Sequence, residues 1–282
     1  MLEPKKIFIA GGLLSRYPLI CKTIYDVCDR EGVEFGILSG AKNIWVRDYM
    51  PIPASGGRYL KFKYAEDWIK YPIRKDSPKT WSKLPDVALL DLFLDGGNCV
   101  VRGDVAFVTQ KAITDNDNGI VKALGKAFKL AVYVLPVEPG DDLGHADGII
   151  NFAPDGSVFI NDYSVMKSKE YDQYLGEVIK AVEAAGLAWR LFPFAYHKMP
   201  KITEKVFRKK FPHADDFNPA YGYYINYLRV GNTFILPVFG IEEDQKAMQM
   251  FDGIRVEPVD CSELSMEGGL IRCVTWESYA IH

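Results

Sequence analysis

Cysteine is scarce in this 282-residue chain, and long apolar runs are missing. The five cysteines are odd in number and widely spaced, so we do not expect a disulfide framework. No segment approaches the roughly 18 consecutive apolar residues of a membrane helix. The first apolar stretch, residues 7–14, is interrupted by two glycines and makes a poor signal peptide. Together these absences predict a cytoplasmic protein that does not bind membranes.

An excess of charge of either sign is also missing. The chain has 34 basic and 37 acidic residues, for a net charge of −3. This balance provides no overall field for nucleic acid or an anionic membrane, so any charged ligand must be recognised by a local site. Hydrophobic residues make up 48% of the chain and aromatic residues 13%, which is ample for a core. We predict a single domain over residues 1–282.

The chain repeats one unit of secondary structure. In three places two predicted strands are followed by a helix and a further strand, with the helices near residues 119–128, 168–185 and 242–251. An earlier hairpin is predicted within residues 44–64. Polar landmarks head these units at spacings of 47, 50, 81 and 47 residues and are Asp48, Asp95, His145, Asn226 and Cys273. This period predicts an α/β repeat architecture of β-β-α-β units with one insertion.

The last unit is incomplete, because only nine residues follow Cys273. Near the other end, the sequence predicts a strand over residues 7–14, a helix over residues 15–30 that is closed by Gly32, and a strand over residues 33–38. We expect these elements to complete the fifth unit and close a ring.

Two segments fall outside the repeat, near residues 66–85 and 196–222. The first carries Arg74 among aromatic residues. The second is rich in lysine and arginine, a composition that more often forms a solvated helix face than a nucleic-acid site. Long loops over a repeat scaffold commonly carry specificity, so we expect these insertions to influence substrate choice.

The motif Gly144-His145-Ala146-Asp147 precedes an apolar run and a turn, which is typical of the first arm of a β-hairpin. Side chains two residues apart on a strand point to the same face. We therefore expect the imidazole and the carboxylate to lie side by side on a strand.

If five units surround one axis, their landmarks meet in one pocket that holds a thiol, an imidazole, carboxylates and an amide. A thiol beside an imidazole is typical of covalent catalysis, because the thiolate is the nucleophile. Carboxylates on both sides indicate a cationic substrate, and a planar guanidinium matches paired carboxylates best. Metal binding is the rival interpretation, but the sequence has no histidines four residues apart and no Cys-x-x-Cys. The pattern favours attack of the thiolate on a guanidinium carbon.

Five segments resemble the guanidino-group-modifying enzyme superfamily, the pentein fold, and within it the branch of agmatine deiminases and bacterial peptidyl-arginine deiminases. They occur in family order and are Trp45-Val46-Arg47-Asp48-Tyr49-Met50-Pro51, Asp95-Gly96-Gly97-Asn98, Gly144-His145-Ala146-Asp147, Tyr224-Ile225-Asn226-Tyr227 and Gly268-Gly269-Leu270-Ile271-Arg272-Cys273-Val274-Thr275. The resemblance implies a five-bladed, pseudo-symmetric α/β propeller of ββαβ units with a central pocket. It also implies chemistry without a metal or cofactor.

The resemblance implies roles for individual residues as well. Asp48 and Asp147 would hold the guanidinium while Cys273 attacks its carbon. His145 would shuttle protons, first to the leaving ammonia and then from the hydrolytic water. The residues that it implies for substrate binding are Trp45 as a wall of the channel, Asp95, Asn226 and, loosely, Arg74 as a partner for a substrate carboxylate.

The chain departs from the family at three of these positions. Asp95 stands where agmatine deiminases carry glutamate and is one methylene shorter, so we expect its contact with His145 or the substrate to be lost or mediated by water. Glu267 and Arg272 replace the usual glycine and histidine before the nucleophile.

These observations predict a deiminase that hydrolyses a guanidino group to a ureido group plus ammonia. The expected substrate is agmatine or an arginine-like molecule, with the C-terminal arginine of a peptide as the alternative. A catalytically silent binding module is a different class, and it has no use for Cys273, His145, Asp48 and Asp147 together. An amidinotransferase, which sends the amidino group to an amine, is a third option. The sequence leaves the oligomeric state open, a homo-oligomer included.

Overall fold

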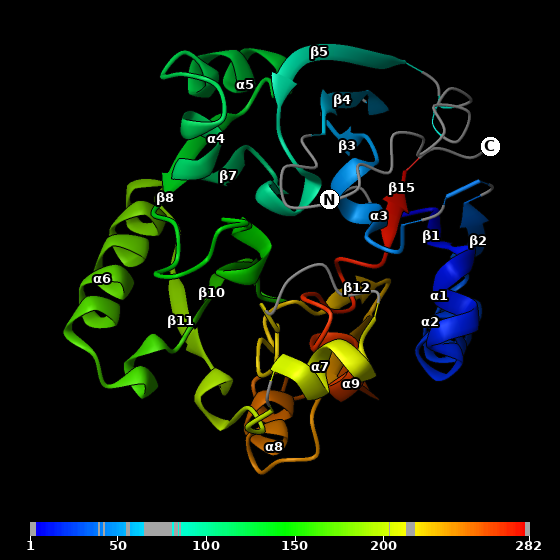
Figure 1. Ribbon diagram of the computed structural model, residues 1–282. Coiled ribbons are helices and arrows are strands. Elements are labelled where there is room, and N and C mark those ends of the chain that lie inside the picture. Colours follow the sequence, from blue (N-terminus) through cyan, green and yellow to red (C-terminus); the bar gives the residue numbers. More distant parts are fainter. Residues whose placement is uncertain are drawn as a thin grey trace.

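The computed structural model describes residues 4–38, 40–41, 43–54, 57–64, 81, 84, 86–202, 204–212 and 218–279. These residues form five three-stranded sheets (Figure 1). In every sheet the middle strand pairs antiparallel with one neighbour and parallel with the other. The predicted β-β-α-β repeat is therefore confirmed.

Four sheets are built from strands that are consecutive in the chain. Their strands, in order, are β3 (Ile52–Pro53), β4 (Tyr59–Lys63) and β5 (Val87–Phe93); β6 (Val100–Arg102), β7 (Val105–Thr109) and β8 (Ala131–Leu135); β9 (Ile150–Phe152), β10 (Val158–Asn161) and β11 (Trp189–Phe192); and β12 (Leu228–Val230), β13 (Thr233–Val238) and β14 (Arg255–Asp260).

The fifth sheet joins the two ends of the chain. Its strands are β15 (Trp276–Ser278), β1 (Lys6–Ala10) and β2 (Glu34–Leu38). Lys6 lies opposite Ser278 in the antiparallel pair and opposite Glu34 in the parallel pair. The expectation that N-terminal elements complete the last unit is confirmed.

Helices connect the parallel strands in four of the units and lie on the outside of the sheets (Figure 1). They are α2 (Pro18–Glu31), α5 (Ile120–Phe128), α6 (Lys169–Ala184) and α8 (Glu243–Gln249). Helix α6 buries Tyr174, Val178 and Val182, which recur every four residues and so share one face. Gly32 ends α2 with a φ of 67°, a left-handed conformation that suits glycine, as predicted.

The predicted strand over residues 7–14 is too long. Pairing with β2 stops at Ala10, and the chain then forms α1 (Gly11–Arg16). Pro18 begins α2 at its first turn, where a missing N–H leaves no hydrogen bond unmade. Other short helices include α4 (Gln110–Thr114), η4 (Tyr163–Met166), η5 (Tyr196–Lys198) and α9 (Ser262–Ser265).

A short helical turn stands before the first strand of three units. These turns are α3 (Val46–Tyr49), η2 (Gly96–Asn98) and η3 (Ala146–Gly148). The prediction that His145 and Asp147 lie on a strand is therefore wrong. The hairpin predicted within residues 44–64 is formed by β3 and β4, but α3 occupies the beginning of that range. The turns pack closely: a Cβ added at Gly96 would lie 1.9 Å from the Arg47 carbonyl oxygen. Such contacts between distant segments outweigh local strand preference.

The first strands of all five sheets line one cavity of about 430 Å³. Its walls include Pro53 of β3, Arg102 of β6, Phe152 of β9, Arg229 of β12 and Glu277 of β15. We call it the arginine cavity, because Arg47, Arg102, Arg229 and Arg272 line it.

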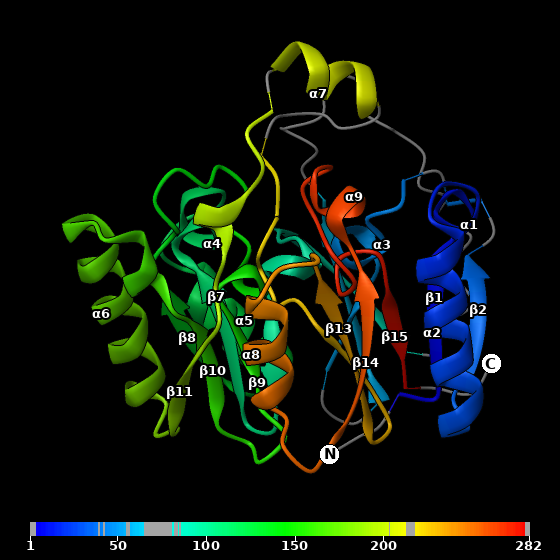
Figure 2. The same ribbon diagram turned by 90° about the horizontal axis from the view of Figure 1, so that it is seen from below.

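The insertion near residues 196–222 carries η5 and α7 (Glu204–Lys210). Helix α7 projects beyond the sheets at one end of the molecule (Figure 2). Its side chain Phe207 is buried with Phe211 and Met266 in a small apolar cluster. Most of the insertion near residues 66–85 lies outside the described residues. No helix in the described parts of the chain is long and apolar enough to cross a membrane.

Candidate functional site

The turns that head the units bring polar side chains to a second cavity, of about 70 Å³. We call it the acidic cavity, and its lining includes Glu138, Asp141, His145, Asp147, Asn226 and Cys273. His145 lies just before η3, and Asp147 lies within it. Asn226 precedes β12, and Cys273 precedes β15. The predicted convergence of these four residues is therefore observed, although short turns rather than strands produce it.

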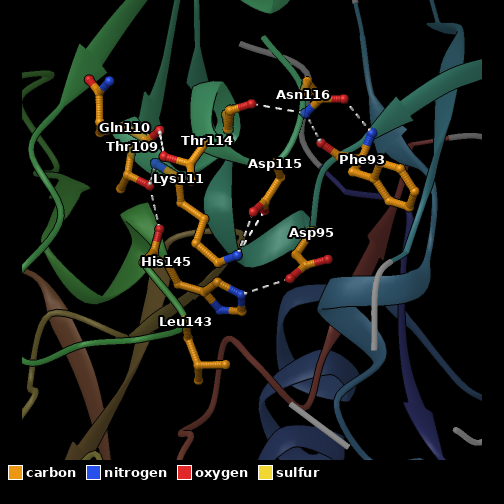
Figure 3. A network of polar contacts seen from close by, with 12 residues as sticks. Phe93, Asp95, Thr109, Gln110, Lys111, Thr114, Asp115, Asn116, Leu143 and His145 are labelled. Carbon is orange, nitrogen blue, oxygen red and sulfur yellow. Dashed lines mark hydrogen bonds and ion pairs between the residues drawn. The ribbon is translucent and has the colours of Figure 1, made fainter. Parts of the chain in front are cut away.

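His145 lies between two carboxyl groups. Its Nε2 is 3.3 Å from Asp95 Oδ2, and its Nδ1 is 3.8 Å from Asp48 Oδ1 (Figure 3 shows the first contact). Asp48 Oδ1 also accepts a hydrogen bond of 3.0 Å from the Gly97 backbone N–H. A Cβ on Gly97 would lie 2.5 Å from His145 Nδ1 and 2.7 Å from Asp48 Oδ1, so only glycine allows this arrangement. The expectation that the shorter Asp95 loses its contact with His145 is wrong.

The backbone before His145 is fixed by a chain of hydrogen bonds. Thr109 donates its hydroxyl to the Gly144 carbonyl oxygen at 2.5 Å, and Gly144 has a φ of 61°. Asp141 accepts the backbone N–H groups of Leu143 and Gly144, each at 2.9 Å. These contacts fix the main chain just before His145 and so help to orient its imidazole.

Burial and neighbouring charge act against each other at His145. Burial lowers the pKa of His145, but the carboxylates of Asp48, Asp95 and Asp147 outweigh it and raise the pKa to about 10. Burial raises the pKa of Asp48 to about 7, with further upward contributions from Asp95 and Asp147 and a downward one from His145. The imidazole is accordingly protonated at neutral pH.

Asn226 forms hydrogen bonds both to Asp147 and to the segment that carries Cys273. It donates through Nδ2 to the Asp147 carbonyl oxygen at 3.3 Å and accepts the Arg272 backbone N–H through Oδ1 at 3.0 Å. Cys273 donates its thiol to the same Oδ1 at 3.5 Å. Burial, and then the negative charges of Asp147 and Asp48, raise the pKa of the Cys273 thiol well above its usual value. Without a bound cation the thiol keeps its proton.

The two departures before Cys273 have different structural roles. Glu267, in place of glycine, accepts hydrogen bonds from Arg16 and Tyr17 and so ties this loop to α1 and α2. Arg272, in place of histidine, puts its Nε 3.5 Å from Asp147 Oδ2. Within the described part of the chain, neither of those two atoms has a hydrogen-bond partner, although both are buried. Burial raises the pKa of Asp147, and the charge of Arg272 opposes that rise.

Sequence reasoning missed Glu138 and its tyrosine partners. Glu138 is 5% exposed and accepts hydrogen bonds from Tyr163 at 2.9 Å and Tyr223 at 2.8 Å. Burial raises the pKa of Glu138 to about 8, against the effect of those hydrogen bonds. The sequence signal that could have identified Glu138 is the acidic segment 138–142, which lies between β8 and Gly144.

Two predicted substrate contacts, those of Trp45 and Arg74, stay predictions. Trp45 is 9% exposed and packs against Gly269, where an added Cβ would lie 2.5 Å from the indole ring and 3.1 Å from Cys273 Cβ. Its role as a channel wall stays a prediction. Arg74 lies outside the described residues, so its predicted contact with a substrate carboxylate also stays a prediction.

Comparison with protein families gives one match that covers most of the chain. The family model for Porphyromonas-type peptidyl-arginine deiminases matches residues 27–278. No curated protein matches the sequence.

Several solved structures are similar to this fold over nearly the whole chain. Agmatine deiminase of Enterococcus faecalis has a TM-score of 0.72 at 16% identity, covering 98% of this chain and 93% of that one. The C. jejuni agmatine deiminase has a TM-score of 0.71 at 15% identity, covering 99% and 94%. DDAH from Pseudomonas aeruginosa has a TM-score of 0.59 at 12% identity, covering 98% and 99%. At these identities the likeness establishes the fold alone.

Proposed function

Since the chain belongs to the Porphyromonas-type peptidyl-arginine deiminase family, which places it among hydrolases of amidine carbon–nitrogen bonds, we propose that it converts a guanidino group to a ureido group plus ammonia. The observation that carries the proposal is the convergence of Cys273, His145, Asp147 and Asn226 on one cavity, with Asp48 and Asp95 beside the imidazole. A thiol, an acid–base group and carboxylates for a cation are the parts that this hydrolysis needs.

The substrate itself would activate the nucleophile. Asp48 and Asp147 raise the pKa of Cys273 after burial, so a guanidinium held between these carboxylates would cancel much of their field. Thiolate formation then becomes easier only when substrate is bound. The resting enzyme keeps a neutral thiol, which limits side reactions of a free thiolate.

The chemical steps balance with the groups present. The Cys273 thiolate forms a bond to the guanidinium carbon, and the carbon–nitrogen bond breaks as protonated His145 gives its proton to the leaving ammonia. Water then attacks the remaining amidino carbon and gives a proton to His145. The carbon–sulfur bond then breaks, the remaining hydroxyl proton of the intermediate passes to sulfur, and the ureido product leaves. This proton replaces the thiol proton that was lost to solvent when the thiolate formed, so the resting thiol is restored.

The fold supports this arrangement if the five sheets are blades of a propeller around one axis. All five first strands line the arginine cavity, and the turns before β9, β12 and β15 line the acidic cavity. A five-bladed ring with its active site at one end accounts for both observations.

We infer that the substrate ends in an ammonium group, as agmatine does. Asp141 lines the same cavity as His145, and a negative group there attracts an ammonium and repels a carboxylate. The alternative is a peptide with C-terminal arginine, which the family name favours.

Ammonia release tests both the reaction and the substrate. The wild-type protein is assayed with agmatine, free arginine and a peptide that ends in arginine, with Cys273→Ala as the blank. We expect release from agmatine to exceed release from the other two. Greater turnover of the peptide reverses the choice of substrate, and no release from any compound contradicts the deiminase itself.

A further inference from the structure

One buried ion pair joins the two cavities. Arg272 lines the arginine cavity, and Asp147 lines the acidic cavity. Arg272 Nε lies 3.5 Å from Asp147 Oδ2, and the two side chains are 15% and 2% exposed. Arg272 is not among the described residues that line the acidic cavity, whereas His145 and Cys273 are. Its guanidinium therefore reaches the Asp147 carboxylate from the side of the arginine cavity.

The main chain at Arg272 is held on both sides, which fixes where its side chain begins. Asn226 Oδ1 accepts the Arg272 backbone N–H at 3.0 Å, and Arg47 Nε donates to the Arg272 carbonyl oxygen at 3.2 Å. The Thr275 hydroxyl donates to the same carbonyl oxygen at 3.2 Å. Because Cys273 follows directly, these hydrogen bonds help to set the guanidinium at one cavity and the thiol at the other.

The contact between the Arg272 and Asp147 side chains is one of charge and not of hydrogen bonding. Among the described residues, the buried Arg272 Nε and Asp147 Oδ2 have no hydrogen-bond partner. A buried carboxylate needs hydrogen bonds or a compensating charge to stay ionised. Since Asp147 Oδ2 accepts no hydrogen bond, nearby positive charge has to stabilise the anion.

The charged and titratable groups around Asp147 come from several elements. The cations are Arg272, His145 and Arg47, and the groups that can be negative are Asp48 and Cys273. Burial raises the pKa of Asp147, and the charge of Arg272 is the largest effect that lowers it. Arg47 is paired with Glu277, and His145 is shared with two other carboxyl groups. Asp147 therefore depends on Arg272 more than on any other of these cations.

We propose that Arg272 is a positioning residue for guanidinium binding: from the side of the arginine cavity, its charge holds the buried Asp147 carboxylate as the anion that receives the substrate guanidinium. This role rests on the proposed function, which supplies the guanidinium ligand. Arg272 acts through Asp147 and does not touch the substrate. Because the contact includes no hydrogen bond, the charge of Arg272 matters more than the planar shape of its guanidinium.

Binding of agmatine to a protein without the nucleophile tests this role in the absence of turnover. In the Cys273→Ala background, calorimetric titration gives the Kd of agmatine at pH 6.5 and at pH 9, with and without Arg272→Gln. At pH 6.5 Arg272→Gln should weaken binding at least about tenfold, because Asp147 then holds a proton and loses its charge. At pH 9 a carboxyl group loses its proton more readily, so the ratio of the two Kd values should fall to about threefold or less. The ratio is the measure, since Asp48 titrates in both proteins.

Two further variants separate the charge of Arg272 from its packing. Arg272→Lys keeps a positive charge and should restore the Kd at pH 6.5 to within about threefold of the parent. Arg102→Gln removes a positive charge from the same cavity, but Arg102 donates to the Ala153 carbonyl oxygen and should leave the Kd unchanged. In the protein that retains Cys273, Arg272→Gln should raise KM more than it lowers kcat, because the lost interaction already acts on bound substrate.

Far-UV circular dichroism shows whether each variant is folded, and Arg272→Met, which keeps a long neutral side chain, replaces Arg272→Gln if that variant is not. The proposal is overturned if agmatine does not bind, if the neutral variant loses the same factor at both pH values, or if Arg272→Lys restores nothing. An equal loss in Arg102→Gln overturns it as well. Ammonia release does not enter these measurements. A protein that shows the expected binding pattern but releases no ammonia contradicts the deiminase and leaves the role of Arg272 standing.

Discussion

The arginine cavity is lined by all five units and the acidic cavity by residues from segments 138–148, 218–226 and 268–273, and the charged side chains around the two cavities are mainly of opposite sign. The acidic cavity is lined by turns that precede the first strands, and the arginine cavity by the strands themselves. Arg272 and Cys273 are adjacent in the chain, yet one lines each cavity. Adjacent residues of the chain therefore line cavities whose charged side chains are mainly of opposite sign.

The comparison also shows how a repeat scaffold keeps buried charge tolerable. An unpaired charge in the interior costs several kcal/mol, so buried charges are commonly paired. Asp147 of the acidic cavity faces Arg272 of the arginine cavity, and Arg47 pairs with Glu277 within the arginine cavity. Buried charge is thus partly neutralised both between the two cavities and within one of them.

The largest expected effect is the loss of activity when the thiol of each cavity is removed. Cys273 lines the acidic cavity and Cys99 lines the arginine cavity. Cys273→Ala should lower kcat more than about a hundredfold, because a lost nucleophile is not replaced by binding. Cys99→Ala is the matched control and should keep most of the activity. Steady-state ammonia release measures both, and equal losses would contradict the assignment of Cys273.

The next effect compares two carboxyls around His145. Asp147→Asn should lower kcat/KM about 10- to 100-fold, the value of one charge-assisted contact to the guanidinium. Asp95→Asn should cost less, because the described contact of Asp95 is with His145 rather than with the space of the cavity. If the two variants lose the same activity, Asp95 also binds substrate.

The pH profile of kcat/KM reports the pKa values of the essential acid and base in the free enzyme. Its acid limb should follow Asp48 near pH 7 and its alkaline limb His145 near pH 10. Asp95 raises both pKa values, so Asp95→Asn should move both limbs to lower pH, by roughly one unit. Asp91→Asn removes a well exposed carboxylate four residues away and should move neither.

The last effect is on the stability of the folded protein and comes from Glu138, at the edge of the acidic cavity. The pKa of Glu138 rises to about 8 on folding, so the folded state holds a proton that the unfolded state releases above its ordinary pKa of 4.5. This contribution is fully present below pH 4.5 and is lost as the pH rises to about 8. Glu138→Gln, which cannot titrate, should lose less stability over that window than the wild type. Thermal unfolding at pH 5, 6.5 and 8 measures the difference, and parallel curves would contradict the raised pKa.

The repeat could be predicted because it depends on local and periodic information. Spacings near 50 residues, hydrophobic periodicity and turn glycines locate the helices α5, α6 and α8 within a few residues. The short C-terminal unit predicts that β1 and β2 complete the fifth sheet, since a single strand leaves unpaired backbone groups. The landmarks Asp48, Asp95, His145, Asn226 and Cys273 follow from the same period.

The sequence by itself determined how many units there are and which polar residues head them. Tertiary structure alone decided where those side chains point, because the turns α3, η2 and η3 form against segments far away in the chain rather than from local preference. It alone decided that Arg272 faces Asp147, that Glu138 is enclosed by tyrosines, and that the five first strands surround a cavity lined by arginines. Such contacts join residues tens to hundreds of positions apart, and no periodic pattern specifies the free energy of packing between them.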